Sequence, residues 1–218
     1  MIPKAGLVVA IDGPAGAGKS TLASRLAGAL ALPCVTTGVM YRAVAREALD
    51  RGVDVEDEVA LAEIAAGIRF SLGDDDPPGL LVDGRPPGDE LVGSDVEAVV
   101  SAVARHPRVR SILRERQRAI ASSGGVVEGR DIGTVVFPDA DLKVFLAADP
   151  AERAARRQQE RETQDPGLAD ALTRRDALDA RTNPLEPAQD ARVVDTTGRD
   201  PAEVLDEVLA LVREVVGA

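Results

Sequence analysis

The sequence predicts an α/β fold in which helices flank a parallel β-sheet. Near the N-terminus, the apolar run GLVVAID (residues 6–12) has the length and β-branched content of a buried strand. A stretch with a leucine at every fourth position from Leu22 to Leu30 follows it and has helical spacing. The same order returns near the C-terminus, where ARVVDTTG (residues 191–198) precedes an amphipathic stretch that opens with Pro201. Strands that alternate with helices are typical of a parallel sheet.

Between these ends, further helical and strand-like segments continue the alternation. Residues 37–52 offer a threonine cap near Thr37 and stop at a glycine, and a weaker helical pattern covers residues 56–66. GVVEGRD (residues 125–131) and LKVFLAADP (residues 142–150) have the composition of short buried strands. We therefore expect several strands of one sheet, connected by helices.

The segment that follows the helical pattern at residues 56–66 differs in composition from its neighbours. Its two short apolar pieces, IRFSL and LLVD, are separated by Asp, Pro and Gly residues, which predicts a small antiparallel hairpin. A helix is expected to begin with a capping box formed by Ser94 and Glu97. Another is expected to begin with Pro107 as its first residue.

On this pattern the chain divides into a core and two additions. We expect the core at residues 1–66, 122–150 and 182–218, and an antiparallel and helical insertion at residues 67–121. Residues 151–181 are polar and highly charged and contain no aromatic residue, which predicts a helical lid. A length of 218 residues suits one large domain that carries such insertions.

Composition and charge limit the classes of partner. The formal net charge of -11 argues against a nucleic-acid binder and against an anionic membrane surface. No apolar run approaches the roughly 18 residues that a membrane span needs. Cys34 is the only cysteine, so an internal disulfide is excluded, and we expect a buried, inert thiol in a reducing, cytoplasmic protein. Nothing in the sequence demands more than a monomer.

The stretch GPAGAGKS fits the pattern G-x-x-x-x-G-K-[ST] between a predicted strand and a predicted helix. Glycines at positions 13, 16 and 18 allow positive φ angles, so that backbone N–H groups can surround a phosphate at a helix N-terminus. In this P-loop arrangement Lys19 reaches the β- and γ-phosphates, and the Ser20 hydroxyl can bind Mg²⁺. The residues expected to hold a nucleoside triphosphate are Gly13, Pro14, Ala15, Gly16, Ala17, Gly18, Lys19, Ser20 and Thr21.

Three functional classes share such a loop. A GTPase needs a D-x-x-G motif, which VVDTTG imitates, but no N-K-x-D signature exists in the sequence. We interpret Asp195 as the end of the last strand. A nucleotide-dependent switch, a kinase for a nucleotide and a kinase for another small acceptor remain open on these motifs alone.

A basic stretch favours an anionic acceptor over the switch. Residues 101–118 contain six arginines and one acid. Arg42, Arg110 and Arg130 follow three different predicted elements, so the fold can bring them to one phosphate. Guanidinium groups suit phosphate because they donate paired, aligned hydrogen bonds.

Several motifs span nearly the whole chain: IDGPAGAGKST, TGVMYR, SAVARHPRVR, EGRDIGTVVFPDADLKVFL and RRDALDARTNPL. Together they resemble those of bacterial cytidylate kinases, which are P-loop nucleoside monophosphate kinases. Adenylate kinases share the first loop, but their D-G-[FY]-P-R turn is absent. The resemblance implies a P-loop NTPase fold with an insertion that binds the nucleoside monophosphate, and ATP- and Mg²⁺-dependent phosphorylation of CMP and dCMP.

The resemblance also implies roles for particular residues. The acceptor-binding residues would be Thr37, Arg42, Ser101, Arg110, Arg130, Asp131 and Asp179. The catalytic cations would be Lys19, Arg130, Arg175 and Arg181, the last two from the lid. A carboxylate and an arginine complement the amino donor and the ring acceptors of cytosine, so uracil should be disfavoured.

The sequence departs from the family pattern at a few positions. Thr37 stands where the family usually has Ser, and Thr36 and Glu128 stand where it has Asp. The pair Leu91-Val92 replaces a common Ile-Arg, and the lid motif is shortened. His106, the only histidine, is expected at a helix junction and not in catalysis.

Overall fold

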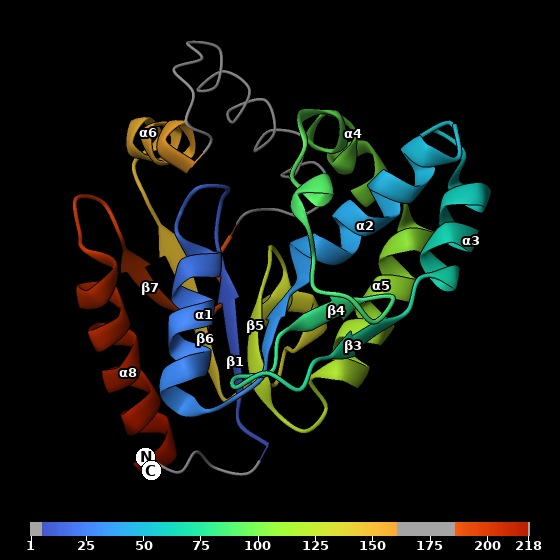
Figure 1. The fold of residues 1–218 in the computed structure, drawn as a ribbon. Helices are drawn as coiled ribbons and strands as arrows, with labels where there is room; N and C mark the ends of the chain where they lie inside the picture. The colour runs from blue at the N-terminus through green and yellow to red at the C-terminus, as the bar shows by residue number, and fades with distance from the viewer. Residues whose placement is uncertain (1–5, 161–185, 218) are drawn as a thin grey trace.

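The computed structural model describes residues 6–160 and 186–217, and it contains a five-stranded sheet beside a group of helices (Figure 1). All neighbouring strands of this sheet are parallel, in the order β2-β5-β1-β6-β7. The strands are β1 (Val8–Asp12), β2 (Cys34–Thr36), β5 (Gly125–Glu128), β6 (Leu142–Ala147) and β7 (Arg192–Asp195). The predicted α/β class with a parallel sheet is confirmed.

The register of the sheet places three strand ends side by side. Ile11, next to the end of β1, pairs with Glu128 at the end of β5. Thr36, at the end of β2, pairs with the same Glu128. Because parallel strands end at the same edge of a sheet, the loops after β1, β2 and β5 emerge together, which is where open α/β sheets bind ligands.

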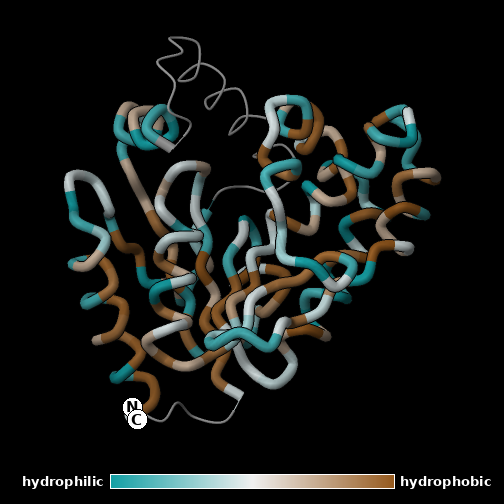
Figure 2. The backbone as a smooth tube through the Cα atoms, viewed as in Figure 1, coloured by the Kyte–Doolittle hydropathy of each residue, from teal (hydrophilic) through white to brown (hydrophobic). Residues whose placement is uncertain are grey.

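One face of the sheet is covered by α1 (Lys19–Leu30) and α8 (Pro201–Gly217) (Figure 1). Buried residues of the two helices and of the strands form one apolar cluster, and Figure 2 shows the hydrophobic segments gathered in this central region. On the opposite face, Ala10, Val35 and Val127 pack with residues of a π-helical turn, Ile132–Val136. This alternation of faces along the strands follows from their two-residue period.

The helices between residues 37 and 120 form a second apolar cluster beside the sheet. The elements concerned are α2 (Thr37–Asp50), α3 (Glu58–Gly67), the hairpin β3 (Phe70–Leu72) and β4 (Leu80–Val82), the 3-10 turn η1 (Asp89–Leu91), α4 (Ser94–Ala104) and α5 (Pro107–Ile120). The antiparallel pairing of β3 and β4 confirms the predicted hairpin. Helices α2 and α3, which begin before residue 67, share this cluster with the predicted insertion. The division into core, insertion and lid remains a prediction.

Local details differ from the sequence-based expectations at the helix starts. Pro107 opens α5 as expected. The predicted capping box is wrong, because Ser94 is already the first residue of α4 and Gly93 stands at the cap without a side-chain bond. The predicted start of α2 near Thr37 is confirmed, and a threonine, Thr36, stands at its N-cap. Its side chain makes no cap bond, and the hydroxyl of Thr37, the first helical residue, donates to the carbonyl of Glu128. A tertiary hydrogen bond has taken the place of the local one.

Helix α6 (Pro150–Glu160) is the part of the predicted lid that the structure describes. The Asp149 carboxylate accepts a hydrogen bond from the backbone N–H of Ala151 at 2.8 Å and begins this helix in the manner of a cap. Across residues 6–160 and 186–217, we find no helix with the length and hydrophobicity to cross a membrane.

Candidate active site

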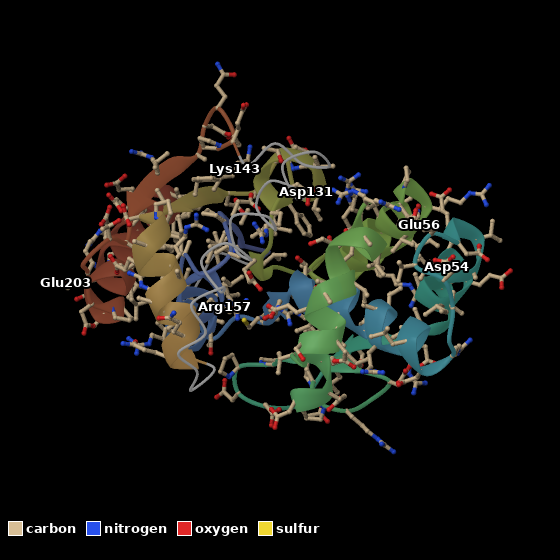
Figure 3. All side chains as sticks on the ribbon, turned by 90° about the horizontal axis from the view of Figure 1, so that it is seen from above. Asp54, Glu56, Asp131, Lys143, Arg157 and Glu203 are labelled. Atoms are coloured by element: carbon tan, nitrogen blue, oxygen red, sulfur yellow. The ribbon has the colours of Figure 1, made fainter. Side chains whose placement is uncertain are left out.

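A cavity of about 520 Å³ opens where the loops after β1, β2 and β5 emerge from the sheet. It extends between the predicted phosphate loop and the helices α2 and α4, and Arg157 of α6 also lines it. Figure 3 looks down on this end of the molecule and labels Arg157 and Asp131. The cavity is therefore bounded by segments that lie far apart in the sequence.

The predicted phosphate loop has the backbone conformation that its glycines allow. Gly13, Gly16 and Gly18 have φ angles of 147°, 75° and 88°, which confirms the prediction of positive φ. A Cβ atom at Gly13 would lie 2.5 Å from the carbonyl oxygen of Leu146 in β6, so only glycine fits there. The loop leads directly into α1, whose N-terminal N–H groups favour an anion.

Lys19 and Ser20 stand at the first turn of α1. The Lys19 ammonium donates to the carbonyl of Pro14 at 2.8 Å, which holds the buried lysine against the loop. The Ser20 hydroxyl donates to Oε1 of Glu128 at 3.3 Å, and both residues line the cavity. A hydroxyl and a carboxylate are oxygen ligands of the kind that Mg²⁺ accepts.

A metal ion at this place would need further ligands. No group of three or more His, Cys, Asp or Glu residues suited to a metal occurs within the described ranges, residues 6–160 and 186–217. Mg²⁺ commonly takes one or two protein oxygens and completes its shell with water and substrate phosphates, so Ser20 and Glu128 fit it. Sequence reasoning missed Glu128; its place at the end of a buried strand next to the loop was the available signal.

The turn after β5 is fixed tightly to its neighbours. A Cβ at Gly129 would lie 2.5 Å from the Thr37 hydroxyl, so the glycine lets α2 approach this turn. The carboxylate of Asp12 accepts hydrogen bonds from the backbone N–H groups of Ile132 and Gly133 at 2.8 and 2.7 Å. Burial raises the pKa of Asp12, and these two bonds partly offset that effect. The residues of the turn are thus held in place from β1.

Asp131 meets two arginines of α5. Its Oδ2 atom accepts from Arg110 at 2.9 Å and from Arg114 at 2.6 Å. Arg110 and Asp131 were predicted to lie near each other, but Arg114 was not singled out. Its position four residues after Arg110, on the same face of a helix, was the signal. Burial also raises the pKa of the neighbouring Tyr41, so this phenol stays neutral.

Arginines on the other side of the cavity share a carboxylate. Arg42 donates to Oε1 of Glu97 at 3.3 Å and to the carbonyl of Leu91 at 3.2 Å. Arg157 of α6 lies 3.6 Å from the same Glu97 oxygen. Arg157 was expected only as part of the lid segment, and no motif distinguished it from its charged neighbours.

The cavity has a positive balance although the chain is acidic. Among the residues that the structure describes, the charged ones that line it are the cations Lys19, Arg42, Arg110, Arg130 and Arg157 and the acids Asp89, Glu128 and Asp131. Five positive groups against three negative ones in a confined site favour an anionic ligand.

Most of the predicted site residues meet at this cavity. Those that line it are Ala15, Gly16, Gly18, Lys19, Ser20, Thr21, Thr37, Arg42, Ser101, Arg110, Arg130 and Asp131. Gly13, Pro14 and Ala17 belong to the same loop but do not line the cavity. Arg175, Asp179 and Arg181 lie outside the described residues. The roles assigned to all these residues remain predictions.

Cys34, His106 and Asp195 were assigned no catalytic role, and the structure places each of them outside the candidate active site. Cys34 is half-buried and not fully buried as expected, but desolvation is still the main cause that raises the pKa of its thiol to about 11, in keeping with an inert cysteine. His106 precedes α5, and its Nε2 lies 2.7 Å from the carbonyl of Val55, which confirms the helix-junction prediction. Asp195 is the last residue of β7, as expected.

Comparisons with known proteins agree with the motifs. The sequence model of the family described as cytidylate kinase matches residues 9–214. The chain is 44% identical to the cytidylate kinase of Pelotomaculum thermopropionicum, with 94% of this chain and 95% of that protein covered. It is 43% identical to the cytidylate kinases of Rhodococcus jostii (97% of each chain covered) and Geobacillus kaustophilus (96% and 97% covered). With a match of this extent and identity, the chain belongs to the cytidylate kinase family.

Proposed function

We propose that the protein transfers the γ-phosphoryl group of ATP to CMP, and also to dCMP, to give ADP and CDP or dCDP. The strongest support, beside the family, is the convergence in one cavity of a phosphate loop, Arg42, Arg130, and the pair of Arg110 and Asp131. The first of these groups suits a triphosphate, the arginines suit an acceptor phosphate, and the ion pair suits a cytosine ring.

The reaction needs little proton chemistry from the protein. The acceptor phosphate is already ionised near neutral pH, so it attacks without a general base. Catalysis then depends on alignment of the two substrates and on positive charge around the phosphoryl group that is transferred. Lys19 on the donor side, and Arg42 and Arg130 on the acceptor side, supply this charge and hold the reacting oxygens in line.

The Ser20 hydroxyl, with Glu128 beside it, would hold Mg²⁺. When bound with ATP, the ion supplies positive charge to the phosphate oxygens. The protein groups orient these two ligand atoms: α1 positions Ser20, and the end of β5 positions Glu128. The fit rests on their mutual distance of 3.3 Å and on their place in the cavity wall.

Selection of the base rests on Asp131 and Arg110, with Ser101 on the wall formed by α4. A carboxylate oxygen accepts from the exocyclic amino group of cytosine, and a guanidinium donates to its ring nitrogen or carbonyl. Uracil presents a carbonyl oxygen where cytosine has the amino group. The carboxylate would then face an acceptor, so UMP should be a poor substrate.

Water must be excluded during the transfer, or ATP would be hydrolysed. By resemblance, Asp179 would contact the ribose hydroxyls of the acceptor, and Arg175 and Arg181 of the lid would close over the phosphates. Arg157 of α6 would join them from the part of the segment that the structure describes. We propose that the enzyme acts as a cytoplasmic monomer on small-molecule substrates, without nucleic acid or membrane.

The decisive experiment is a panel of acceptors in a coupled assay of ADP release. CMP and dCMP should give high kcat/KM, and UMP, AMP and dTMP low values. Turnover on AMP or dTMP with none on CMP would refute the proposal and favour a kinase for another acceptor. Slow turnover with every acceptor combined with tight GTP binding would instead indicate a switch.

A further inference from the structure

Two arginines of α5 bond to Asp131, which is one more than recognition of a base requires. Arg110 lines the cavity, whereas Arg114 does not. We infer that Arg114 is a positioning residue for base selection: it fixes the carboxylate of Asp131 from behind, so that one oxygen faces the base. This inference rests on the proposed function.

The hydrogen bonds divide the two oxygens of Asp131. Within residues 6–160 and 186–217, side-chain hydrogen bonds reach Asp131 from Arg110 and Arg114 alone, and both end on Oδ2. The Asp131 side chain is 11% exposed and lines the cavity. Its other oxygen, Oδ1, is therefore the atom with unused acceptor capacity, and a carboxylate oxygen has two lone pairs for a donor such as a cytosine amino group.

The second arginine changes what the first one does. A lone arginine and a carboxylate favour a fork in which two parallel N–H groups engage both oxygens. Such a fork between Arg110 and Asp131 would occupy Oδ1 as well as Oδ2. With Arg114 also bonded to Oδ2, at 2.6 Å, Arg110 makes a single bond to that atom and directs Nη1 to the carbonyl of Ala104 at 3.2 Å. Arg114 thus prevents Arg110 and Asp131 from forming a two-bond fork that would occupy Oδ1.

The helix makes this arrangement rigid. Arg110 and Arg114 are one turn apart on α5, so their guanidinium groups reach Asp131 from successive turns of the helix. Asp131 itself is anchored by its backbone carbonyl, which accepts from Val135 at 2.9 Å and Val136 at 3.1 Å. Rotation of the carboxylate is the remaining freedom, and Arg114 removes it.

The consequence concerns discrimination between bases and not the phosphoryl transfer. Without Arg114, Oδ1 would turn toward Arg110, and the advantage of an amino group over a carbonyl at that position of the base would shrink. The donor side, which includes Lys19 and Ser20, would not be affected. A residue that only stabilised the fold would change the kinetics of CMP, UMP and ATP together.

The test compares steady-state kinetics with CMP, UMP and ATP for wild type, Arg114→Leu and Arg114→Lys. Arg108→Gln is the matched control, because it removes a cation from an exposed position of the same helix. Arg114→Leu should lower the ratio of kcat/KM for CMP to that for UMP about tenfold, mainly through KM for CMP. KM for ATP and kcat with CMP should stay within about twofold, Arg114→Lys should restore much of the ratio, and Arg108→Gln should keep it.

Each result has one meaning. An unchanged CMP-to-UMP ratio in Arg114→Leu, or an equal rise of KM for ATP and CMP, would overturn the inference while leaving the kinase activity intact. A wild-type enzyme that does not use CMP would overturn the proposed function itself. If Arg114→Leu does not fold, as judged by thermal melting, Arg114→Gln carries the same measurements.

Discussion

Replacing Asp131 by asparagine should reverse the hydrogen-bonding character of the atom that faces the base. Arg110 and Arg114 both donate to Oδ2, so an amide at this position must turn its carbonyl oxygen toward them. The NH₂ group then takes the place of Oδ1 at the cavity. An amide NH₂ donates to the carbonyl of uracil and faces a second donor in cytosine.

The magnitude follows from the bonds exchanged. CMP loses one hydrogen bond to a charged acceptor, worth about 1.5–3 kcal/mol, and UMP gains a neutral one, worth about 0.5–1.5 kcal/mol. The two effects add in the ratio, so kcat/KM for CMP relative to UMP should fall by about 2–4.5 kcal/mol, or roughly 30- to 2000-fold. The loss for CMP alone should be about 10- to 150-fold.

The coupled assay of ADP release measures both acceptors at saturating ATP, and KM for ATP is measured separately. Asp139→Asn is the control, because Asp139 is exposed and lies outside the candidate active site. If Asp131→Asn lowers activity on CMP and UMP by the same factor, the carboxylate does not read the base. If KM for ATP rises as much as KM for CMP, Asp131 does not belong to the acceptor side.

The other predictions concern the phosphate loop, the turn after β5 and the thiol. Lys19→Ala should lower kcat about 100- to 1000-fold in the ADP-release assay, and a kcat within tenfold of wild type would remove Lys19 from the transition state. Asp12→Ala leaves two buried N–H groups without their acceptor and should lower the free energy of unfolding in urea by about 2–5 kcal/mol. A decrease in the free energy of unfolding of less than about 1 kcal/mol, as expected for a substitution at the surface, would contradict that anchoring role. With a pKa of about 11, the Cys34 thiol should react with a maleimide or disulfide reagent at pH 8 roughly 100-fold more slowly than in urea, and equal rates would contradict its burial. Folding raises this pKa, so the neutral thiol contributes its full share of the free energy of unfolding below about pH 9. That contribution is lost as the pH rises through 11. The resulting pH dependence of urea unfolding should disappear in Cys34→Ser.

Features set by local chemistry could be predicted from the sequence. The phosphate loop is one of them, since glycines at fixed spacing before a helix encode its positive φ angles. The hairpin and Pro107 at the start of α5 are others, because turn residues and proline restrict the backbone wherever they occur. The meeting of Arg42, Arg110 and Arg130 at one cavity was also predicted, from their places in three different elements. Parallel strand ends explain only the place of Arg130 after β5, since Arg42 and Arg110 lie on helices α2 and α5.

Features set by side-chain geometry across elements could not be predicted. Six arginines lie between residues 101 and 118, and nothing local shows that Arg114 reaches Asp131 while Arg118 bonds to the carbonyls of Val135 and Val136. The choice depends on how α5 crosses the turn after β5. The hydrogen bond of the Thr37 hydroxyl has the same origin, because its acceptor is a carbonyl 91 positions away in the chain.

Two carboxylates in this site each serve two arginines, and their positions imply different behaviour toward a ligand. Glu97 joins Arg42 to Arg157, two residues that line the cavity, and a bound phosphate would compete with Glu97 for their guanidinium groups. Asp131 joins two arginines of one helix through Oδ2 alone, so on the inference above a base would add a bond at Oδ1 without displacing one. Phosphate binding therefore replaces Glu97 as a partner of these guanidinium groups, whereas base binding fills a fixed acceptor. Discrimination between bases should consequently depend on the rigidity of the Asp131 cluster, and affinity for the phosphate on how readily Glu97 gives up its partners.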